Sequence, residues 1–224
     1  MAESAKRRNP ALKSGGRKQT GNTRDKIINA ALRIVTRDGM RGVRHRAVAQ
    51  EAGVPLGSTT YYFKSIDDLI STAFEYWREK ADSIRSSFAQ ELGGIAARYD
   101  SDDNYDMQQA VTDVYRSVHA YLLDQIDAGK DDRVIELAFY HEALHCERLR
   151  SLVERYWASE LAGLRMLHEF FGSADPQADA ELSLALIHQI ERFSVVEHNL
   201  KASRQRLDTT LKHYFEMTFQ VSIS

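Results

Sequence analysis

Along most of this chain, hydrophobic residues recur every three or four positions, as they do on one face of an amphipathic helix. Short polar or glycine-containing stretches separate the segments that have this spacing. The pattern predicts an all-α protein. The expected helices cover residues 23–38, 43–52, 55–63, 65–91, 106–127, 134–144, 148–171, 178–200 and 205–219.

Residues 43–63 have the pattern of a helix-turn-helix. Gly53 ends the first helix and can take the positive φ of a sharp turn. Pro55 suits the first turn of the second helix, where its missing N–H costs nothing. Small side chains let that second helix approach a partner closely, and hydroxyl groups can bond phosphates or base edges. We therefore expect the second helix to enter a DNA major groove.

The distribution of charge supports this hypothesis. Residues 1–70 hold 14 Lys and Arg against 6 Asp and Glu, whereas residues 71–224 hold 16 against 26. Only the first third is suited to meet a polyanion. We predict a basic arm over residues 1–22, which either follows the DNA or is a solvated tail. A DNA-binding domain over residues 23–70 comes next, and residues 71–224 form the rest.

Composition sets the remaining bounds. The 224 residues, 43% of them hydrophobic, can bury a substantial core. A single cysteine, Cys146, excludes an intrachain disulfide framework and agrees with a reducing compartment. Neither a bilayer-spanning apolar run nor an apolar signal core at the N-terminus is present. We expect a cytoplasmic protein with no membrane partner.

Residues 23–70 resemble the DNA-binding domain of the TetR family of bacterial regulators. The matching stretches are VAQEAGV at 48–54, Gly57, YFKS at 62–65 and DL at 68–69. The resemblance implies an all-helical homodimer whose larger C-terminal domain, here residues 71–224, binds a small molecule and dimerises. The chain departs from the family pattern at Arg44, Thr60 and Ile66, where Thr, Tyr and Lys are usual.

Residues of the helix-turn-helix are assigned to DNA by their place in it. Arg44, His45 and Arg46 open the first of its helices and should lie near phosphates. Base edges are expected to meet the side chains of Leu56, Ser58, Thr59 and Tyr61. Gly57 allows close approach, and the DNA backbone is assigned to Thr60, Tyr62 and Lys64.

The helix expected over residues 178–200 is apolar on two sides. Leu182, Leu186 and Ile190 lie on one side, and Leu184 and Ile187 lie on another. A helix with two apolar faces needs two partners, and a second subunit is one source. Burial within a single subunit is the other explanation. The family resemblance favours a four-helix dimer interface.

His141 to His145 spell H-E-x-x-H, the motif in which two imidazoles bind zinc from one helix face. A zinc metallopeptidase or a metal-dependent sensor, using Cys146 as well, is therefore the alternative hypothesis. The extension that supplies a third histidine is absent, because Arg148 stands at the glycine position. His141 could instead be a structural core residue or donate a hydrogen bond into a ligand pocket, and we favour the last.

Aromatic and histidine side chains gather in the C-terminal region, as in an apolar cavity with a few polar anchors. The tentative effector-binding residues are Tyr115, His119, Tyr140, His141, Tyr156 and His188. No phosphate loop, nucleophile elbow or paired-carboxylate motif is present, so we predict no enzyme activity, catalytic residue, cofactor or metal.

These observations predict a ligand-responsive transcriptional regulator, and most simply a repressor. We expect it to bind a roughly palindromic operator as a homodimer. A small-molecule effector, whose identity the sequence does not specify, would favour a spacing of the two DNA-binding domains that misses successive major grooves.

Overall fold

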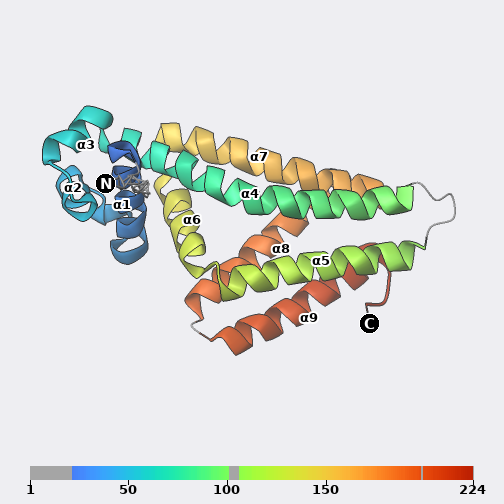
Figure 1. Ribbon diagram of the computed structural model, residues 1–224. Helices are drawn as coiled ribbons and strands as arrows, with labels where there is room; N and C mark the ends of the chain where they lie inside the picture. The colour runs from blue at the N-terminus through green and yellow to red at the C-terminus, as the bar shows by residue number, and fades with distance from the viewer. Residues whose placement is uncertain (1–21, 101–105, 198, 224) are drawn as a thin grey trace, which may run out of the picture.

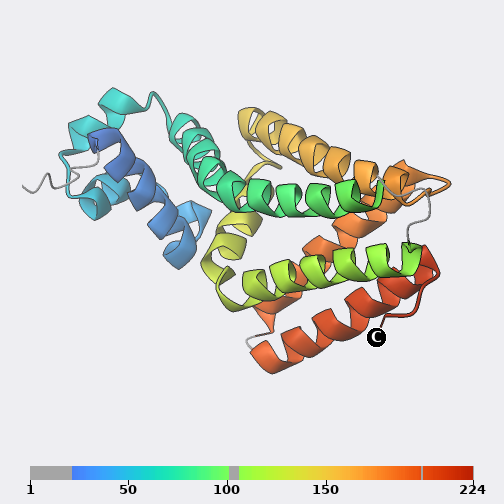
Figure 2. The same cartoon turned by 45° about the vertical axis from the view of Figure 1, so that its right-hand side comes forward.

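A computed structural model describes residues 22–100, 106–197 and 199–223. These residues form α-helices with one short 3₁₀ helix, and none of them lies in a strand. α1–α3 form a headpiece at one end of an elongated molecule, and the remaining helices form a larger C-terminal domain (Figures 1 and 2). The elements are α1 Thr23–Asp38, η1 Met40–Gly42, α2 His45–Ala52, α3 Leu56–Tyr62, α4 Ile66–Asp100, α5 Met107–Asp127, α6 Lys130–Glu142, α7 Glu147–Phe170, α8 Pro176–Val196 and α9 Leu200–Phe219.

The first helix begins and ends where local signals predict. The side chain of Asn22 accepts a hydrogen bond from the Arg24 N–H, and Asp25 lies in the first turn, where the helix dipole favours an anion. Gly39 ends the helix with φ of 72°. The all-α prediction is therefore confirmed, down to the caps of this helix.

α4 is longer than predicted. It was expected to end near Glu91, before Gly93 and Gly94, but it continues through both glycines to Asp100. Glycine costs about 1 kcal/mol relative to alanine inside a helix, and packing outweighs that cost. Ile95, one residue beyond the pair, is buried in the second core described below.

The acidic and polar composition of residues 99–106 predicts a loop, but this segment lies partly in helices. Tyr99 belongs to α4, and its hydroxyl donates to Asp113 of α5 at 2.9 Å. Asp106 caps α5 through the Gln109 N–H, as expected of a cap. Residues 101–105 are outside the described part of the chain, and so are residues 1–21 of the predicted basic arm.

The predicted bend at residues 201–203 is wrong. Asn199 caps α9 by accepting a hydrogen bond from the Ala202 N–H at 3.1 Å, so these residues form the first turn of α9. Because Asn199 lies outside any hydrophobic stripe, its capping role was not visible in the periodicity. The predicted starting point of this helix, Gln205, lies more than one turn too late.

Two hydrophobic cores organise the described residues. The first joins α1 and the start of α4 to α6 and α7, with Phe74, Phe139 and Leu149 near its centre. The second joins the far half of α4 to α5, α8 and α9. The first core therefore includes residues on both sides of the domain boundary predicted at residue 70. The boundary itself stays a prediction. No helix in the described ranges is long and apolar enough to cross a membrane.

α6 connects the headpiece to the C-terminal domain. Its Phe139 contacts Phe74 of α4 edge-to-face, with ring centroids 5.3 Å apart. The indole N–H of Trp77 donates to Asp132 at the start of α6 at 2.9 Å. One face of α6 is thus part of the core on which α1 rests.

The helical spacing of Val134, Leu137, Ala138, His141 and Leu144 predicts that they form the inward face of α6. This prediction is wrong, because His141 is exposed and Leu144 is 64% exposed. The buried residues are Arg133, Ile135, Glu136 and Phe139. Two of the four are charged, and a search for apolar positions passes over them.

Candidate nucleic-acid interface and two internal cavities

α3 presents most of one face to solvent. Gly53, in the left-handed conformation at φ 65°, turns the chain between α2 and α3. Tyr61 is 82% exposed, and its ring contacts that of Tyr62 edge-to-face at 5.1 Å. A side chain added at Gly57 would meet open space, and Leu56 is exposed beside it. The sequence-predicted residues of α3 thus form one accessible surface, with a single exception.

The exception is Thr59, which was expected to meet base edges. It is fully buried, and its hydroxyl donates to the carbonyl oxygen of Leu56 at 2.8 Å. Thr59 and Phe63 are four residues apart, so both lie on the inward face of this stretch. Thr60 is exposed and donates to the carbonyl oxygen of Gly57 at 3.2 Å.

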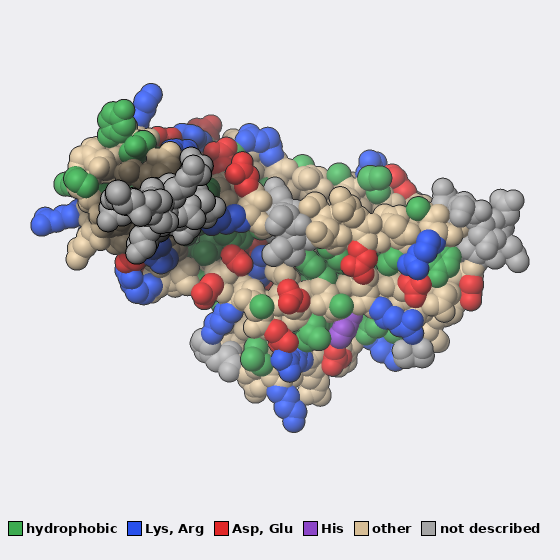
Figure 3. Space-filling model, in the orientation of Figure 1, with side chains coloured by type: hydrophobic (Ala, Val, Ile, Leu, Met, Phe, Trp, Pro, Cys, Tyr) green, Lys and Arg blue, Asp and Glu red, His purple; other side chains and the backbone are tan. Residues whose placement is uncertain are grey.

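Four cations surround this surface without ion pairs. Arg41, Arg44, Arg46 and Lys64 are exposed, and none forms a side-chain salt bridge with any residue that the structure describes. Figure 3 shows Lys and Arg side chains projecting from the headpiece end of the molecule. His45 is half-buried at the start of α2. The arginines and the lysine predicted to contact the DNA backbone therefore lie in the headpiece, and their charges are not paired within the described residues.

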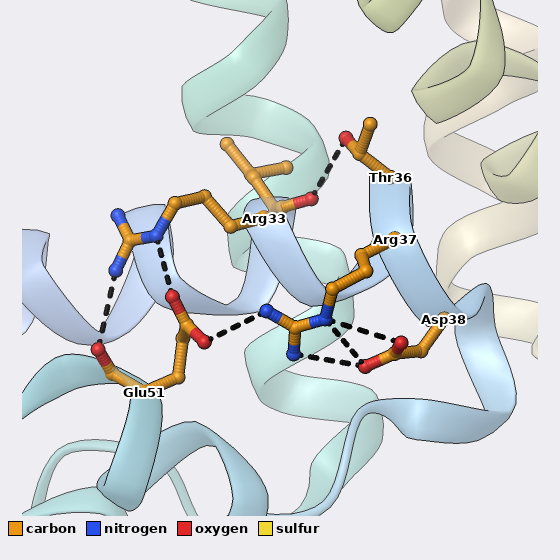
Figure 4. Close-up of polar contacts among 6 residues, drawn as sticks. Arg33, Thr36, Arg37, Asp38 and Glu51 are labelled. Atoms are coloured by element: carbon orange, nitrogen blue, oxygen red, sulfur yellow. Dashed lines mark hydrogen bonds and ion pairs between the residues drawn. The ribbon is translucent and has the colours of Figure 1, made fainter.

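Other headpiece cations are used internally. The Glu51 carboxylate of α2 accepts from Arg33 at 2.8 Å and from Arg37 at 3.0 Å, both on α1 (Figure 4). The hydrogen bond from Arg33, followed by that from Arg37, holds the pKa of Glu51 below its usual value. This cluster holds α2 against α1. Arg33 and Arg37 thus have a structural role, unlike the headpiece arginines that form no ion pair.

Asp68 ties the end of the helix-turn-helix to the C-terminal domain. Its carboxylate accepts from the backbone N–H of Lys64 at 3.1 Å and from Arg148 of α7 at 2.6 Å. The hydroxyl of Ser65 in turn accepts from the Asp68 N–H, as the predicted capping box requires. Partial burial raises the pKa of Asp68. The hydrogen bonds from Lys64 and Arg148 lower it by more, so the pKa lies below its usual value.

A polar cavity of about 400 Å³, including its open mouth, lies between α6, α7 and α8. It is lined by Arg133, Glu136, Leu137, Tyr140, Trp157, His188, Glu191 and Arg192. Arg133 Nη1 donates to Glu136 at 2.7 Å and to Glu191 of α8 at 3.0 Å. Tyr140 donates to the other oxygen of Glu136 at 2.9 Å. Two predicted effector residues, Tyr140 and His188, meet here.

Burial and charge shift the pKa values around this cavity. Burial raises the pKa of the Tyr140 phenol, and the Glu136 carboxylate raises it further. Burial lowers the pKa of His188, but Glu160, 3.7 Å away, outweighs this, so the net pKa is raised. Sequence reasoning missed Arg133, Glu136 and Glu191. The available signal was an Arg–Glu pair three residues apart on a helix with buried neighbours.

The other predicted effector residues are dispersed. Tyr156 donates to Glu160, which faces His188, so it lies behind the polar cavity rather than on its wall. Tyr115 packs edge-to-face on Phe215 of α9. His119 meets Asp208 at 2.7 Å. Both lie between α5 and α9, and His141 is on the surface.

A second, apolar cavity of about 550 Å³, including its mouth, lies between α4, α5, α7, α8 and α9. Its walls are mostly aliphatic and aromatic, and the lining residues with polar groups are Tyr121, His168, Ser183 and Tyr214. His168 Nε2 lies 2.8 Å from the Ser183 hydroxyl, which lies 2.6 Å from the Tyr214 hydroxyl. None of these residues was among the predicted effector contacts.

The H-E-x-x-H stretch does not lie on one helix face. α6 ends at Glu142, so His145 falls in the turn that follows, and the two imidazole rings are 5.8 Å apart. Among the described residues, no group of three His, Cys, Asp or Glu side chains is placed to hold a metal ion. The residues present do not fit the zinc site that the motif would require.

An exposed α3, cations without ion pairs and a helical domain with internal cavities are the features expected of a DNA-binding transcriptional regulator. Residues 27–73 match the family model for bacterial regulatory proteins of the tetR family. The resemblance to the TetR family is confirmed for this part of the chain, which contains the helix-turn-helix.

Relatives agree with this assignment. The HTH-type transcriptional regulator PksA of Bacillus subtilis (strain 168) is 34% identical over 70 residues, which are 31% of this chain and 34% of that protein. The match thus spans about a third of that relative.

Solved structures extend the likeness to the C-terminal domain. A transcriptional regulator from Rhodococcus sp. Rha1 superposes with a TM-score of 0.63 at 17% identity, over 89% of this chain and 97% of that one. At this identity the likeness shows the fold alone. The multidrug binding protein EbrR, solved in complex with ethidium, has a TM-score of 0.56 at 29% identity, over 86% and 99%.

Proposed function

We propose that this chain is a ligand-responsive repressor that binds a roughly palindromic operator as a homodimer and leaves it when a small molecule binds. The observation that carries the DNA-binding half is the group of unpaired cations around the exposed face of α3. Cations that have no partner within the protein are free to neutralise phosphates and release their counterions.

The proposed DNA contacts are of two kinds, to phosphates and to base edges, according to where the residues lie in the headpiece. Arg44 caps α2 without a side-chain hydrogen bond, so the first N–H groups of α2 stay open to a phosphate. His45 and Arg46 lie beside that end. Leu56, Ser58 and Tyr61 are proposed to meet base edges, with Gly57 allowing close approach. Backbone contacts fall to Thr60, Tyr62 and Lys64.

A second copy of the chain fits the exposed stripe of α8. Ala178, Leu182, Ala185 and Val196 are all exposed, at helical spacing along one side of α8. Small and apolar residues of this kind suit the helix-on-helix contact of a dimer. A dimer would place two copies of α3 on half-sites about 34 Å apart, one turn of DNA.

Ligand response is supported by the position of α4. Phe88 and Leu92 of this helix line a cavity of the C-terminal domain, whereas Leu69 and Phe74 near its start belong to the core shared with α1. A molecule that favours a shifted α4 would therefore shift the headpiece. The likeness to a protein solved with ethidium supports a small organic effector.

One experiment tests the DNA-binding half. Fragments bound from the source genome are selected, and their affinity for the protein is measured by fluorescence anisotropy at several salt concentrations. Arg46→Gln should weaken binding about tenfold and reduce the slope of log affinity against log salt by about one. Arg165→Gln, an exposed arginine of α7, is the matched control and should leave the slope unchanged.

Sedimentation of the same complexes should find two chains for each selected site. An Arg46→Gln slope equal to that of the wild type would remove α2 from the interface. A single chain at each site would contradict the homodimer.

A further inference from the structure

The two cavities differ in the charge of their polar groups. In the polar cavity, Nη1 of Arg133 pairs with Glu136 and Glu191, whereas its buried Nε has no hydrogen-bond partner among the described residues. A ligand that enters this cavity must therefore compete with buried ion pairs. In the apolar cavity, three of the polar residues, His168, Ser183 and Tyr214, form a short hydrogen-bond chain between uncharged groups.

The direction of that chain follows from its last acceptor. The Tyr214 hydroxyl donates to the carbonyl oxygen of Asp179 at 3.4 Å, and a carbonyl oxygen can only accept. The Ser183 hydroxyl therefore donates to Tyr214. Ser183 in turn accepts, and the only ring atom near it is Nε2 of His168. The proton of neutral His168 thus lies on Nε2.

This tautomer leaves an unused acceptor. His168 is 1% exposed, and burial lowers the pKa of its imidazole more than Asp179 raises it, so the ring is neutral near pH 7. Nδ1 then carries a lone pair and has no hydrogen-bond partner among the described residues. Buried polar atoms in native proteins nearly always have a partner, so this one calls for an explanation.

The ring is also held in place. It stacks on Phe219 with centroids 5.5 Å apart and planes 8° from parallel. Phe88, Leu92, Leu164 and Ile187 line other parts of the cavity and offer apolar contact area. A mostly apolar wall with a few polar groups is typical of sites for small organic molecules.

We propose that the apolar cavity, rather than the polar one, holds the effector, and that the effector is an uncharged, mostly apolar molecule whose hydroxyl donates to Nδ1 of His168. The role of this molecule as an effector rests on the proposed function, whereas its binding to the cavity does not.

Three probes, of which the first two are equal in size, test the ligand class by calorimetry on the full chain without DNA. They are 4-propylphenol, which can donate, 4-propyltoluene, which has a methyl group in place of the hydroxyl, and 4-propylacetophenone, which can only accept. The phenol should bind about tenfold more tightly than the toluene. The acetophenone should gain nothing over the toluene.

Equal affinities of the three probes, or no binding of the phenol at millimolar concentration, would overturn the proposal. An acetophenone that binds as tightly as the phenol would show that Nδ1 carries the proton, and that result overturns the ligand class.

Variants locate the site. His168→Phe keeps an aromatic ring against Phe219 but lacks the lone pair, so the ratio of phenol to toluene affinity should fall to about one. Tyr140→Phe, in the polar cavity, is the matched control and should keep the wild-type ratio. A folded His168→Phe that retains the ratio contradicts the site. If that variant does not fold, the three probes on the wild type still decide the ligand class.

Release from DNA is measured separately, on the fragments selected above. Weaker DNA binding in the presence of 4-propylphenol in the wild type, but not in His168→Phe, supports both the ligand site and its role as effector site. Tight, donor-dependent binding of the phenol without any change in DNA affinity keeps the ligand site and contradicts its role in release.

Discussion

The polar and apolar cavities share α7 and α8, yet the polar groups that they bury differ in charge. The polar cavity gathers Arg133, Glu136 and Glu191, and these charges neutralise one another. In the apolar cavity the chain from Asp179 to His168 leaves one acceptor unused. The comparison teaches that a concentration of charge is a poor guide to a ligand site. An unused partner within an otherwise apolar wall is a better one.

The largest expected effect is on the polar cavity. Arg133→Met leaves Glu136 and Glu191 buried without their cation, which should cost about 3–5 kcal/mol of unfolding free energy. For a chain of this size the midpoint of thermal unfolding should fall by about 10 °C. Calorimetric unfolding measures it.

The control for that variant replaces the whole ion group. Arg133→Met combined with Glu136→Met and Glu191→Met removes the unpaired charges and should recover most of the lost stability. Equal unfolding midpoints for Arg133→Met and the wild type would show that the ion group does not stabilise the folded protein.

An intermediate effect is expected in the apolar cavity, on binding rather than on stability. Leu164→Phe should occupy part of the cavity, changing the unfolding free energy by no more than about 1.5 kcal/mol. It should weaken binding of 4-propylphenol about tenfold in calorimetry, because it takes up ligand space. Leu161→Phe, one turn earlier on α7 and outside both cavities, should keep wild-type affinity.

The smallest effect concerns His188 and pH. Its pKa is raised above the ordinary value of 6.5, because Glu160, Glu191 and Glu136 outweigh its burial. A raised pKa in the folded state means that the protonated form stabilises, fully below about pH 6.5 and less as pH rises through the folded value.

The unfolding free energy of the wild type should therefore exceed that of His188→Gln by about 1 kcal/mol or less at pH 6. The difference should shrink by pH 9. Denaturant titrations at the two pH values measure it, and a difference that grows with pH would mean that His188 is held neutral.

Most of the fold was predictable because its boundaries are local. Asn22 caps α1 with its own side chain, and the glycines at positions 39 and 53 act through their own backbone, so the sequence displays all three directly. The family motif added the place of the helix-turn-helix. The helix boundaries that were predicted wrongly, at Gly93 and at Asn199, depend on packing or on a cap outside the hydrophobic pattern.

The sites were harder to predict because a side chain's direction depends on helix register. Thr59 and Tyr61 are two residues apart on α3, yet the first is fully buried and the second is 82% exposed. On α6, Arg133 is buried because Glu191 approaches from α8, a partner 58 residues away. His168 gave no signal in the sequence, since its role arises from the chain of hydroxyls that folding brings to it.

The placement of Trp77 gives the protein an internal optical probe. The chain has two tryptophans, and Trp77 lies buried at the junction of α4 and α6, with its indole N–H on Asp132. The emission wavelength of indole follows the polarity around the ring. In a Trp157→Phe background, a shift of the remaining emission to longer wavelength would report separation of α6 from α4 in real time. The headpiece movement could thus be followed without attaching a dye.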